Sequence, residues 1–255
     1  MNDYIINVPP YLRKMNSLPD DPANSVAYGL ETESCNIFMM TYPIGNQNAM
    51  PYGNEQAVIN GIHNALSDSQ GLIEVKSGNT QSQKSYIYSI VKSKQNPSGM
   101  QYNLTMHINM NEYSFNIQVF CDEVGMTGMR DSVVIQKLIN EGTVKMPNMD
   151  GWFKDPYDNS FKKGLLMNLS EKPEYDAMFP NHPLSILRNI INNLPFYVLK
   201  HTTFSQSNSR THTLMYYESY RPIQTILGIK STDFTLSISM RVSKHNKPLY
   251  HSKFI

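Results

Sequence analysis

The sequence predicts an α+β protein in which helices pack on an antiparallel sheet, followed by a second, smaller α+β half. Two neighbouring segments, residues 100–110 and 113–121, alternate apolar and polar side chains, which is the period of a β-strand. Two other segments, residues 54–67 and 131–140, repeat apolar residues at helical spacing. Antiparallel strands interrupted by helices are typical of this layered architecture.

The two alternating segments predict a β-hairpin. We expect a loop centred on residues 110–111, because this register pairs His107 with Ser114 and Leu104 with Ile117. Polar side chains then face polar ones, and apolar side chains face apolar ones, along the whole ladder. The sheet therefore has one apolar face and one face of neutral hydrogen-bonding groups, which an antiparallel sheet tolerates.

Four further strands are expected upstream of the hairpin. Residues 85–92 are rich in tyrosine, isoleucine and valine, which favour strands. Residues 35–44 are apolar on both faces and predict a central strand that is covered on both sides. Two shorter candidates, residues 4–8 and 26–30, are separated by a turn rich in proline and aspartate at residues 18–22.

Both helices carry end signals. Asn54 is a suitable N-cap for the first helix. The negative charge of Glu55 in the first turn interacts favourably with the positive end of the helix dipole. The second helix has an apolar stripe from Val134 to Ile139 and is stopped by Gly142.

The first half of the chain resembles a known superfamily. Besides the order of elements, the resemblance includes Ile-Asn-Val-Pro at residues 6–9 and the loop Gly-Met-Thr-Gly-Met-Arg at residues 125–130. Residues 4–140 are similar in these features to the Mog1/PsbP-like superfamily, which includes small bacterial proteins of the DcrB and Eag-chaperone type. The resemblance implies a domain of this fold over residues 1–143. It also implies a binding or chaperone-like role without a catalytic centre, so no catalytic residue is carried over.

Residues 144–255 are predicted to form a second α+β domain of unknown type that is closely packed on the first. Asn168 and Glu171 have the spacing of a capping box. Pro183 suits the first position of a helix that Pro195 ends. Strands are expected at the segments 214–220, 227–229 and 234–242, and the last residues, 248–255, are expected to dock on the body.

Part of this second half, residues 175–188, resembles only uncharacterised proteins of low-GC Gram-positive bacteria, and no function comes with that resemblance.

Composition limits the classes of function. A formal net charge of +1 and a charged fraction of 17% give no reason to expect nucleic acid as a partner. No apolar run approaches the length of a membrane span, and the N-terminus lacks a basic region before an apolar one. Cys35 and Cys121 are too far apart in sequence for a disulfide framework, and we expect buried thiols in the reducing cytoplasm of a bacterium.

His182 is the strongest candidate for a catalytic base, because Asp176 and Asp155 supply carboxylates in the same half. A hydrolase site between the halves would use these three side chains. However, no serine or cysteine stands in a Gly-x-Ser-x-Gly elbow. Alternatively, His182 belongs to a proline-rich turn at the start of a helix, while Asp176 and Arg188 hold two short helices together.

Binding surfaces are expected in two places. The first is the polar face of the hairpin, which carries Asn103, Thr105, His107, Asn116 and Gln118. The second is the loop before the second helix, where Met126 and Met129 supply adaptable apolar contacts and Arg130 could assist an anion at the backbone amides. Each has a plainer alternative: a wet or covered sheet face, methionines that fill the core, and an ordinary turn into a helix.

These observations predict a non-enzymatic, protein-binding or chaperone-like adaptor with a protein partner of unknown identity. A hydrolase centred on His182 and a structural subunit of a larger assembly, including a homo-oligomer, remain as alternatives. No histidine or cysteine pattern matches a zinc site, and no glycine-rich nucleotide motif is present. We therefore expect neither a metal ion nor another cofactor.

Overall fold

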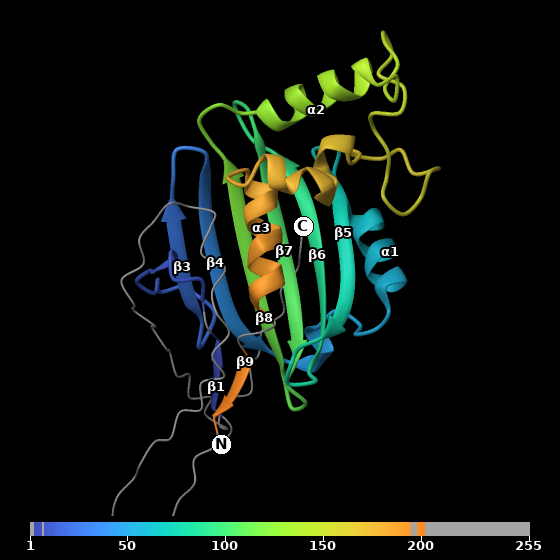
Figure 1. Cartoon of the computed structure of the whole chain (residues 1–255). Helices are drawn as coiled ribbons and strands as arrows, with labels where there is room; N and C mark the ends of the chain where they lie inside the picture. Colours follow the sequence, from blue (N-terminus) through green and yellow to red (C-terminus); the bar gives the residue numbers. More distant parts are fainter. Residues whose placement is uncertain (1–2, 7, 195–197, 202–255) are drawn as a thin grey trace, which may run out of the picture.

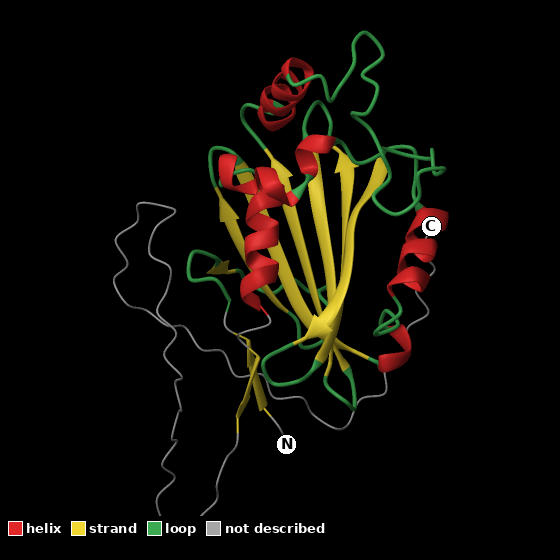
Figure 2. Cartoon of the chain, turned by 45° about the vertical axis from the view of Figure 1, so that its right-hand side comes forward, coloured by secondary structure: helices red, strands yellow, loops and turns green. Residues whose placement is uncertain are grey.

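A seven-stranded antiparallel sheet forms the centre of the structure, a computed structural model that describes residues 3–6, 8–194 and 198–201. The strand order is β2-β3-β4-β8-β7-β6-β5 (Figure 1). Helices lie against both faces of this sheet (Figure 2), so the predicted α+β class is confirmed. The strands of the sheet are β2 (Arg13–Lys14), β3 (Val26–Glu31), β4 (Cys35–Ile44), β5 (Gln70–Asn79), β6 (Ser85–Lys94), β7 (Met100–Asn109) and β8 (Ser114–Glu123).

The remaining elements are short strands and helices. Strands β1 (Asp3–Ile6) and β9 (Val198–His201) pair with each other in a separate two-stranded sheet. The α-helices are α1 (Glu55–Ala65), α2 (Met129–Asn140) and α3 (Pro183–Asn193), and the short 3-10 helices are η1 (Asn46–Asn48), η2 (Leu169–Glu171) and η3 (Pro173–Met178). Within the described ranges, no helix is both long enough and apolar enough to cross a lipid bilayer. The strands expected at the segments 214–220, 227–229 and 234–242, and the segment 248–255, lie outside the described residues.

The predicted hairpin is present as β7 and β8, but its register differs by two residues from the expected one. Asn109 pairs with Ser114, so the loop spans residues 110–113. Asn111 in this loop adopts a left-handed backbone conformation (φ 73°), which asparagine tolerates better than most residues. Because a shift of two residues keeps each side chain on its face, the apolar and polar faces are as predicted. The ladder joins His107 to Asn116, Thr105 to Gln118 and Leu104 to Val119.

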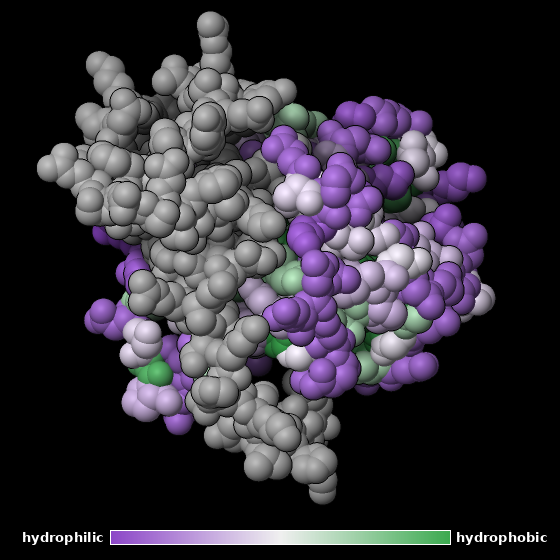
Figure 3. All heavy atoms as spheres, turned by 90° about the horizontal axis from the view of Figure 1, so that it is seen from below, coloured by the Kyte–Doolittle hydropathy of each residue, from purple (hydrophilic) through white to green (hydrophobic). Residues whose placement is uncertain are grey.

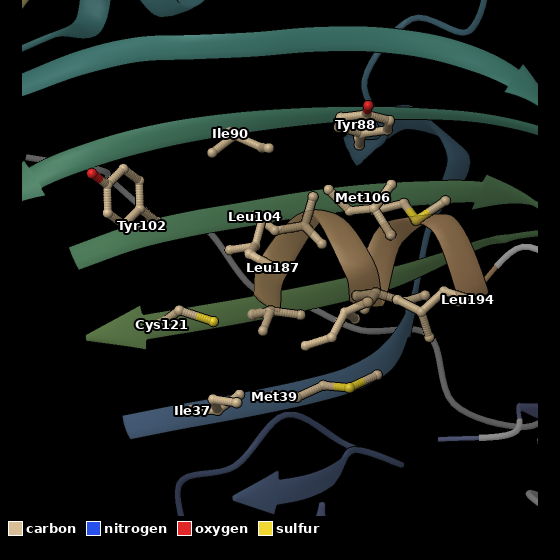
Figure 4. Close-up of a cluster of buried hydrophobic side chains, with 14 of the residues drawn as sticks. Ile37, Met39, Tyr88, Ile90, Tyr102, Leu104, Met106, Cys121, Leu187 and Leu194 are labelled. Carbon is tan, nitrogen blue, oxygen red and sulfur yellow. The ribbon is translucent and has the colours of Figure 1, made fainter. Parts of the chain in front are cut away.

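Helix α3 covers the apolar face of the sheet. Leu187 and Leu194 point from the helix toward Met106 and neighbouring side chains of the strands (Figure 4). The cap residue His182 accepts a hydrogen bond from the Leu184 N–H, and Pro183 occupies the first position, as the sequence predicts. Burial of each such leucine stabilises the fold by about 1.5–3 kcal/mol. The α3 side chains in this cluster are Leu184, Leu187, Ile190, Ile191 and Leu194.

The opposite face of the sheet, here called the distal face, is covered unevenly. Helix α1 packs on its β5 end, where Val58 and Ile59 contact Leu72. Toward β4, Phe38 and Met40 are only half-buried, so the expected cover on both sides of this strand is incomplete. The predicted cap of α1 is confirmed, since Asn54 Oδ1 accepts a hydrogen bond from the Ala57 N–H at 3.1 Å.

Strand β5 is the one long strand of the sheet that the sequence did not indicate. A bulge between Leu72 and Glu74 interrupts its period of two. The bulge brings Ile73 into the α3 cluster, and Glu74 next along the chain also lies on the α3 side, where it bonds to Tyr88. Two consecutive residues therefore serve the same face, which hides the alternation from a search of the sequence.

The outer edge of β5, the last strand of the sheet, is covered by the loop at residues 153–165. The Tyr157 hydroxyl donates to the Val75 carbonyl at 3.1 Å and accepts from the Val75 N–H at 2.6 Å. The Leu165 N–H donates to the Gln70 carbonyl at 2.8 Å. Gly71 is required beside this contact, because a Cβ atom there would lie 1.7 Å from the Leu165 carbonyl oxygen.

Residues 144–194 of the predicted second half share their core with the sheet. Helix α3 belongs to the main cluster, and Trp152 and Tyr175 pack against Val134 and Leu138 of α2 in a third cluster. The capping box at Asn168 and Glu171 is confirmed, and the helix that it begins is the short 3-10 helix η2. The division of the chain into residues 1–143 and 144–255 stays a prediction.

Candidate functional site

His182 lies at the start of α3 with a largely buried ring. Its Nδ1 accepts from the Leu184 N–H at 3.2 Å, and its Nε2 lies 3.9 Å from Glu123 Oε1. The ring also meets the Tyr102 ring edge-on, with centroids 5.5 Å apart. Burial, and then the charges of Arg130 and Arg188, lower the pKa of His182 to about 3. The imidazole is therefore neutral and acts as a helix cap.

The carboxylates proposed as partners of His182 are engaged elsewhere. Asp176 forms ion pairs with Arg130 Nη2 at 3.0 Å and with Arg188 Nη1 at 3.1 Å. Asp155 pairs with His63 Nε2 at 3.0 Å. Neither aspartate has a hydrogen bond to His182 in the described part of the chain, so the base-and-carboxylate pair of the hydrolase alternative is not assembled. The alternative contact between Asp176 and Arg188 is present.

A buried ion network replaces that predicted site. Lys92 Nζ lies 2.8 Å from Glu171 Oε2, and both side chains are almost completely buried. Tyr102 donates to the other oxygen of Glu171 at 3.1 Å, and burial followed by the Glu171 charge raises the pKa of Tyr102 well above its usual value. Tyr102 therefore remains a donor. The charged members of the network are Glu74, Lys92, Arg130, Glu171, Asp176 and Arg188.

The two arginines connect the network to the backbone. Arg130 donates to the carbonyl oxygens of Ser170 at 2.7 Å and Lys172 at 3.0 Å. Arg188 donates to Glu74 at 3.1 Å and to the Glu171 carbonyl at 2.8 Å. Because guanidinium groups present several fixed donors, each arginine joins several segments at once. The network thus fixes residues 168–188 on the end of the sheet.

This arrangement was not indicated by the sequence, except for the capping box. Glu171 closes that box by accepting from the Asn168 N–H at 2.8 Å, and the same oxygen pairs with Lys92. Arg130 is 1% exposed, and its guanidinium is bound inside the network. The expected role of Arg130 in binding an anion at the loop before α2 is therefore wrong. A lone arginine in the first turn of a helix carries no sequence signal for such burial.

The pair of His63 and Asp155 anchors the loop on α1. The His63 ring stacks on Phe161 with centroids 3.9 Å apart. The second oxygen of Asp155 accepts from the N–H groups of Tyr157 and Asp158, at 2.9 and 2.8 Å, so the aspartate shapes the turn. A carboxylate that orients a histidine is one part of a catalytic site. The described hydrogen bonds place no nucleophile beside it, and its contacts fit an anchor.

The polar residues of the hairpin fall into two groups. His107 and Asn116 are buried, and in the segment after η1 the Met50 N–H donates to His107 Nδ1 at 2.8 Å. Burial lowers the pKa of His107 to about 4. Asn103, Thr105 and Gln118 remain half-buried on the distal face. The Oδ1 atom of Asn103 is buried without a donor among the described residues.

The predicted methionines are exposed. Met126 is 75% exposed in the loop before α2, and Met129 is 46% exposed in the first turn of the helix. Val133, one turn later on the same side of α2, is 44% exposed. These three residues form the α2 methionine surface. Core filling, the plainer alternative for these methionines, does not apply to Met126 and Met129.

The lowered pKa values predict that acid destabilises the protein. Because the pKa of His182 falls from 6.5 in the unfolded chain to about 3, the unfolded state binds more protons between these values. The stability that the neutral His182 contributes is fully present above pH 6.5 and declines by about 1.4 kcal/mol per pH unit below it. We expect His182→Asn, which keeps an N-cap, to reduce the measured slope by about 1.4 kcal/mol per pH unit when urea unfolding is measured from pH 7 to 5. The slope that remains belongs to His107, whose pKa is also lowered and which both proteins retain.

Glu123 acts in the opposite direction near the lower limit, since burial raises the pKa of its carboxyl group. The comparison of His182→Asn with the unmodified chain removes this contribution, because both proteins retain Glu123. Equal slopes for the two proteins would contradict the prediction.

Comparison with known proteins gives structural matches alone. No protein-family model and no curated protein matches the chain. A protein of unknown function from Pseudomonas aeruginosa, PA94, aligns with 54% of this chain and 99% of its own, at 8% identity and a TM-score of 0.32. The Saccharomyces cerevisiae Ran-binding protein Mog1p aligns with 52% of this chain and 78% of its own, at 12% identity and a TM-score of 0.34.

Proposed function

We propose that this protein is a non-enzymatic adaptor of the bacterial cytosol that holds a protein partner on the α2 methionine surface. The observation that carries the proposal is the exposure of Met126, Met129 and Val133 on one loop and one side of a helix. Methionine is flexible and polarizable, so a surface rich in it adapts to a partner. The described surface at the opposite end of the molecule is mostly hydrophilic, with small apolar spots (Figure 3).

The base of this surface is rigid. Helix α2 is fixed from below by Arg130, whose guanidinium is inside the ion network, and by Val134 and Leu138, which pack against Trp152. Figure 1 shows α2 beyond the end of the sheet, on the side away from β1 and β9. A surface held in one shape before binding loses less conformational entropy when the partner arrives.

The state of the cysteines is consistent with a reducing compartment. Cys35 and Cys121 are free and buried. A side-chain hydrogen bond with Cys35, together with burial, raises the pKa of the Cys121 thiol well above its usual value. Such a thiol has little of the reactive thiolate form, which suits a structural rather than a redox role.

The adaptor role predicts position-dependent crosslinking. A photo-reactive amino acid placed at Met129 should form a discrete adduct with one protein in cells that make the chain, and excess unlabelled protein should compete with it. The same group at Asn60, an exposed position on the different helix α1, is the matched control. Serine at all three positions of the surface should abolish binding of the captured protein but change the free energy of unfolding by about 0.5 kcal/mol or less.

Identical adducts from Met129 and Asn60, or no adduct at Met129, would remove the support for this surface. Binding that survives the triple serine variant would place the contact elsewhere on the molecule.

A further inference from the structure

A hollow of about 610 Å³ lies on the distal face, where β2, β3, β4 and β8 meet. Strand register explains its position. Gly29 pairs with Arg13 on one side and with Phe38 on the other, and Phe38 pairs with Phe120. The four residues form one row across the sheet, and the glycine leaves a gap in it. The hollow therefore lies above Gly29, where this row lacks a side chain and the Met15 thioether approaches from one side.

The walls of the hollow differ in character. Phe38 and Phe120 form one apolar wall, with ring centroids 6.2 Å apart. The Met15 side chain lies on the other side, where its sulfur would be 2.9 Å from a Cβ atom at Gly29. Met15 is 45% exposed. A slim apolar group fits between the phenylalanine rings and the thioether.

Charges of both signs surround this apolar centre. Arg13 and Lys14 are exposed cations on β2, and neither has an ion-pair partner among the described residues. Glu31 and Asp122 supply carboxylates in the next row toward the end of the strands, where both align with Asn36. A ligand that complements the hollow carries an anionic and a cationic group on either side of an apolar one.

The length of the hollow suits an extended chain. Its lining includes three consecutive residues from β3 (29–31), three from β4 (36–38), and residues 13–15, which comprise β2 and the residue after it. Three residues of a strand span about 10 Å. We propose that this hollow binds a short extended peptide segment in which a basic, an apolar and an acidic side chain follow one another. The basic side chain lies near Glu31 and Asp122, the apolar one on Phe38, and the acidic one near Arg13.

This binding site is separate from the α2 methionine surface, so the two proposals are tested independently. The test uses NMR of the ¹⁵N-labelled full chain and three blocked tripeptides, Glu-Leu-Lys, Glu-Leu-Glu and Lys-Leu-Lys. We expect Glu-Leu-Lys to shift the amide signals of Gly29 and Glu31 in a saturable manner. The two peptides of single charge sign should bind at least five times more weakly.

A charge reversal provides the sharper comparison. Glu31→Lys should reverse the preference, so that Glu-Leu-Glu becomes the tightest ligand. Glu33→Lys makes the same charge change in the exposed turn beyond the hollow and should leave the preference unchanged. Gly29→Val should abolish binding of all three peptides, since its side chain fills the gap and the flexible end of Met15 can move aside.

Three outcomes would overturn the proposal. One is the absence of shifts at Gly29 with every peptide. Another is equal affinity for the three peptides, which would indicate an apolar contact without charge recognition. The third is saturable binding of free leucine or acetate with no gain from the tripeptide, which would indicate a small-molecule site. The serine variant of the α2 methionine surface should bind the peptide normally, whether or not that surface holds a partner.

Discussion

Replacement of Arg130 by methionine should lower the free energy of unfolding by about 3–5 kcal/mol, because it removes one partner from a buried ion network. The guanidinium donates to Ser185 Oγ at 2.8 Å and pairs with Asp176 at 3.0 Å, in addition to its two backbone carbonyls. Methionine keeps the aliphatic stem but removes the buried donor to the carbonyls of Ser170 and Lys172. Asp176 keeps its ion pair with Arg188 but loses the one with Arg130. Urea unfolding followed by the fluorescence of Trp152 measures the loss, since this tryptophan packs beside α2.

Lys137→Met is the matched control for this prediction. Lys137 lies on the same helix, and its ion pair with Glu141 is about half exposed on both sides. Such a surface pair contributes little, so the control should change stability by less than about 1 kcal/mol. A loss below that value for Arg130→Met would show that the network does not hold residues 168–188 in place.

Leu187→Ala is expected to have an effect of similar size, about 2.5–5 kcal/mol, for a different reason. Leu187 is completely buried between α3 and the sheet, where the strands cannot close the cavity that a truncated side chain leaves. The exposed Asn192 on the same helix offers a control, because Asn192→Ala should be close to neutral.

The same variant tests whether the described part of the second half folds together with the sheet. Far-ultraviolet circular dichroism reports the whole fold, whereas Trp152 reports the region around α2. Coincident transitions in both signals are expected for the normal chain and for Leu187→Ala, as for one cooperative unit. Two separated transitions would support an independent unit after residue 143.

The elements with strong local signals were predictable from the sequence. The alternation of residues 100–110 gave the hairpin faces, Asn54 gave a helix start, and the pair of Asn168 and Glu171 gave the capping box. These signals depend on neighbours in the chain. The hairpin register was wrong by two residues because the loop conformation at Asn111 is not encoded in the alternation itself.

The remaining features depend on distant contacts. The bulge at Ile73 broke the period that would have indicated β5. Glu74 and Arg188 form an ion pair within the network although they are 114 residues apart in the sequence. Their spacing in the sequence therefore gives no indication of this contact. The candidate surfaces were predictable by residue type, but burial decided among them: Met126 is exposed, whereas Arg130 and His107 are enclosed.

The occupied edge of β5 has a consequence for self-association. An unpaired outer strand is a template on which a second chain can add its own strand and start a fibril. Here the Tyr157 hydroxyl already uses both backbone groups of Val75, and Leu165 uses the carbonyl of Gln70. A second molecule would have to displace this loop before it could extend the sheet at β5. Polymerisation through that strand is therefore blocked by the chain itself.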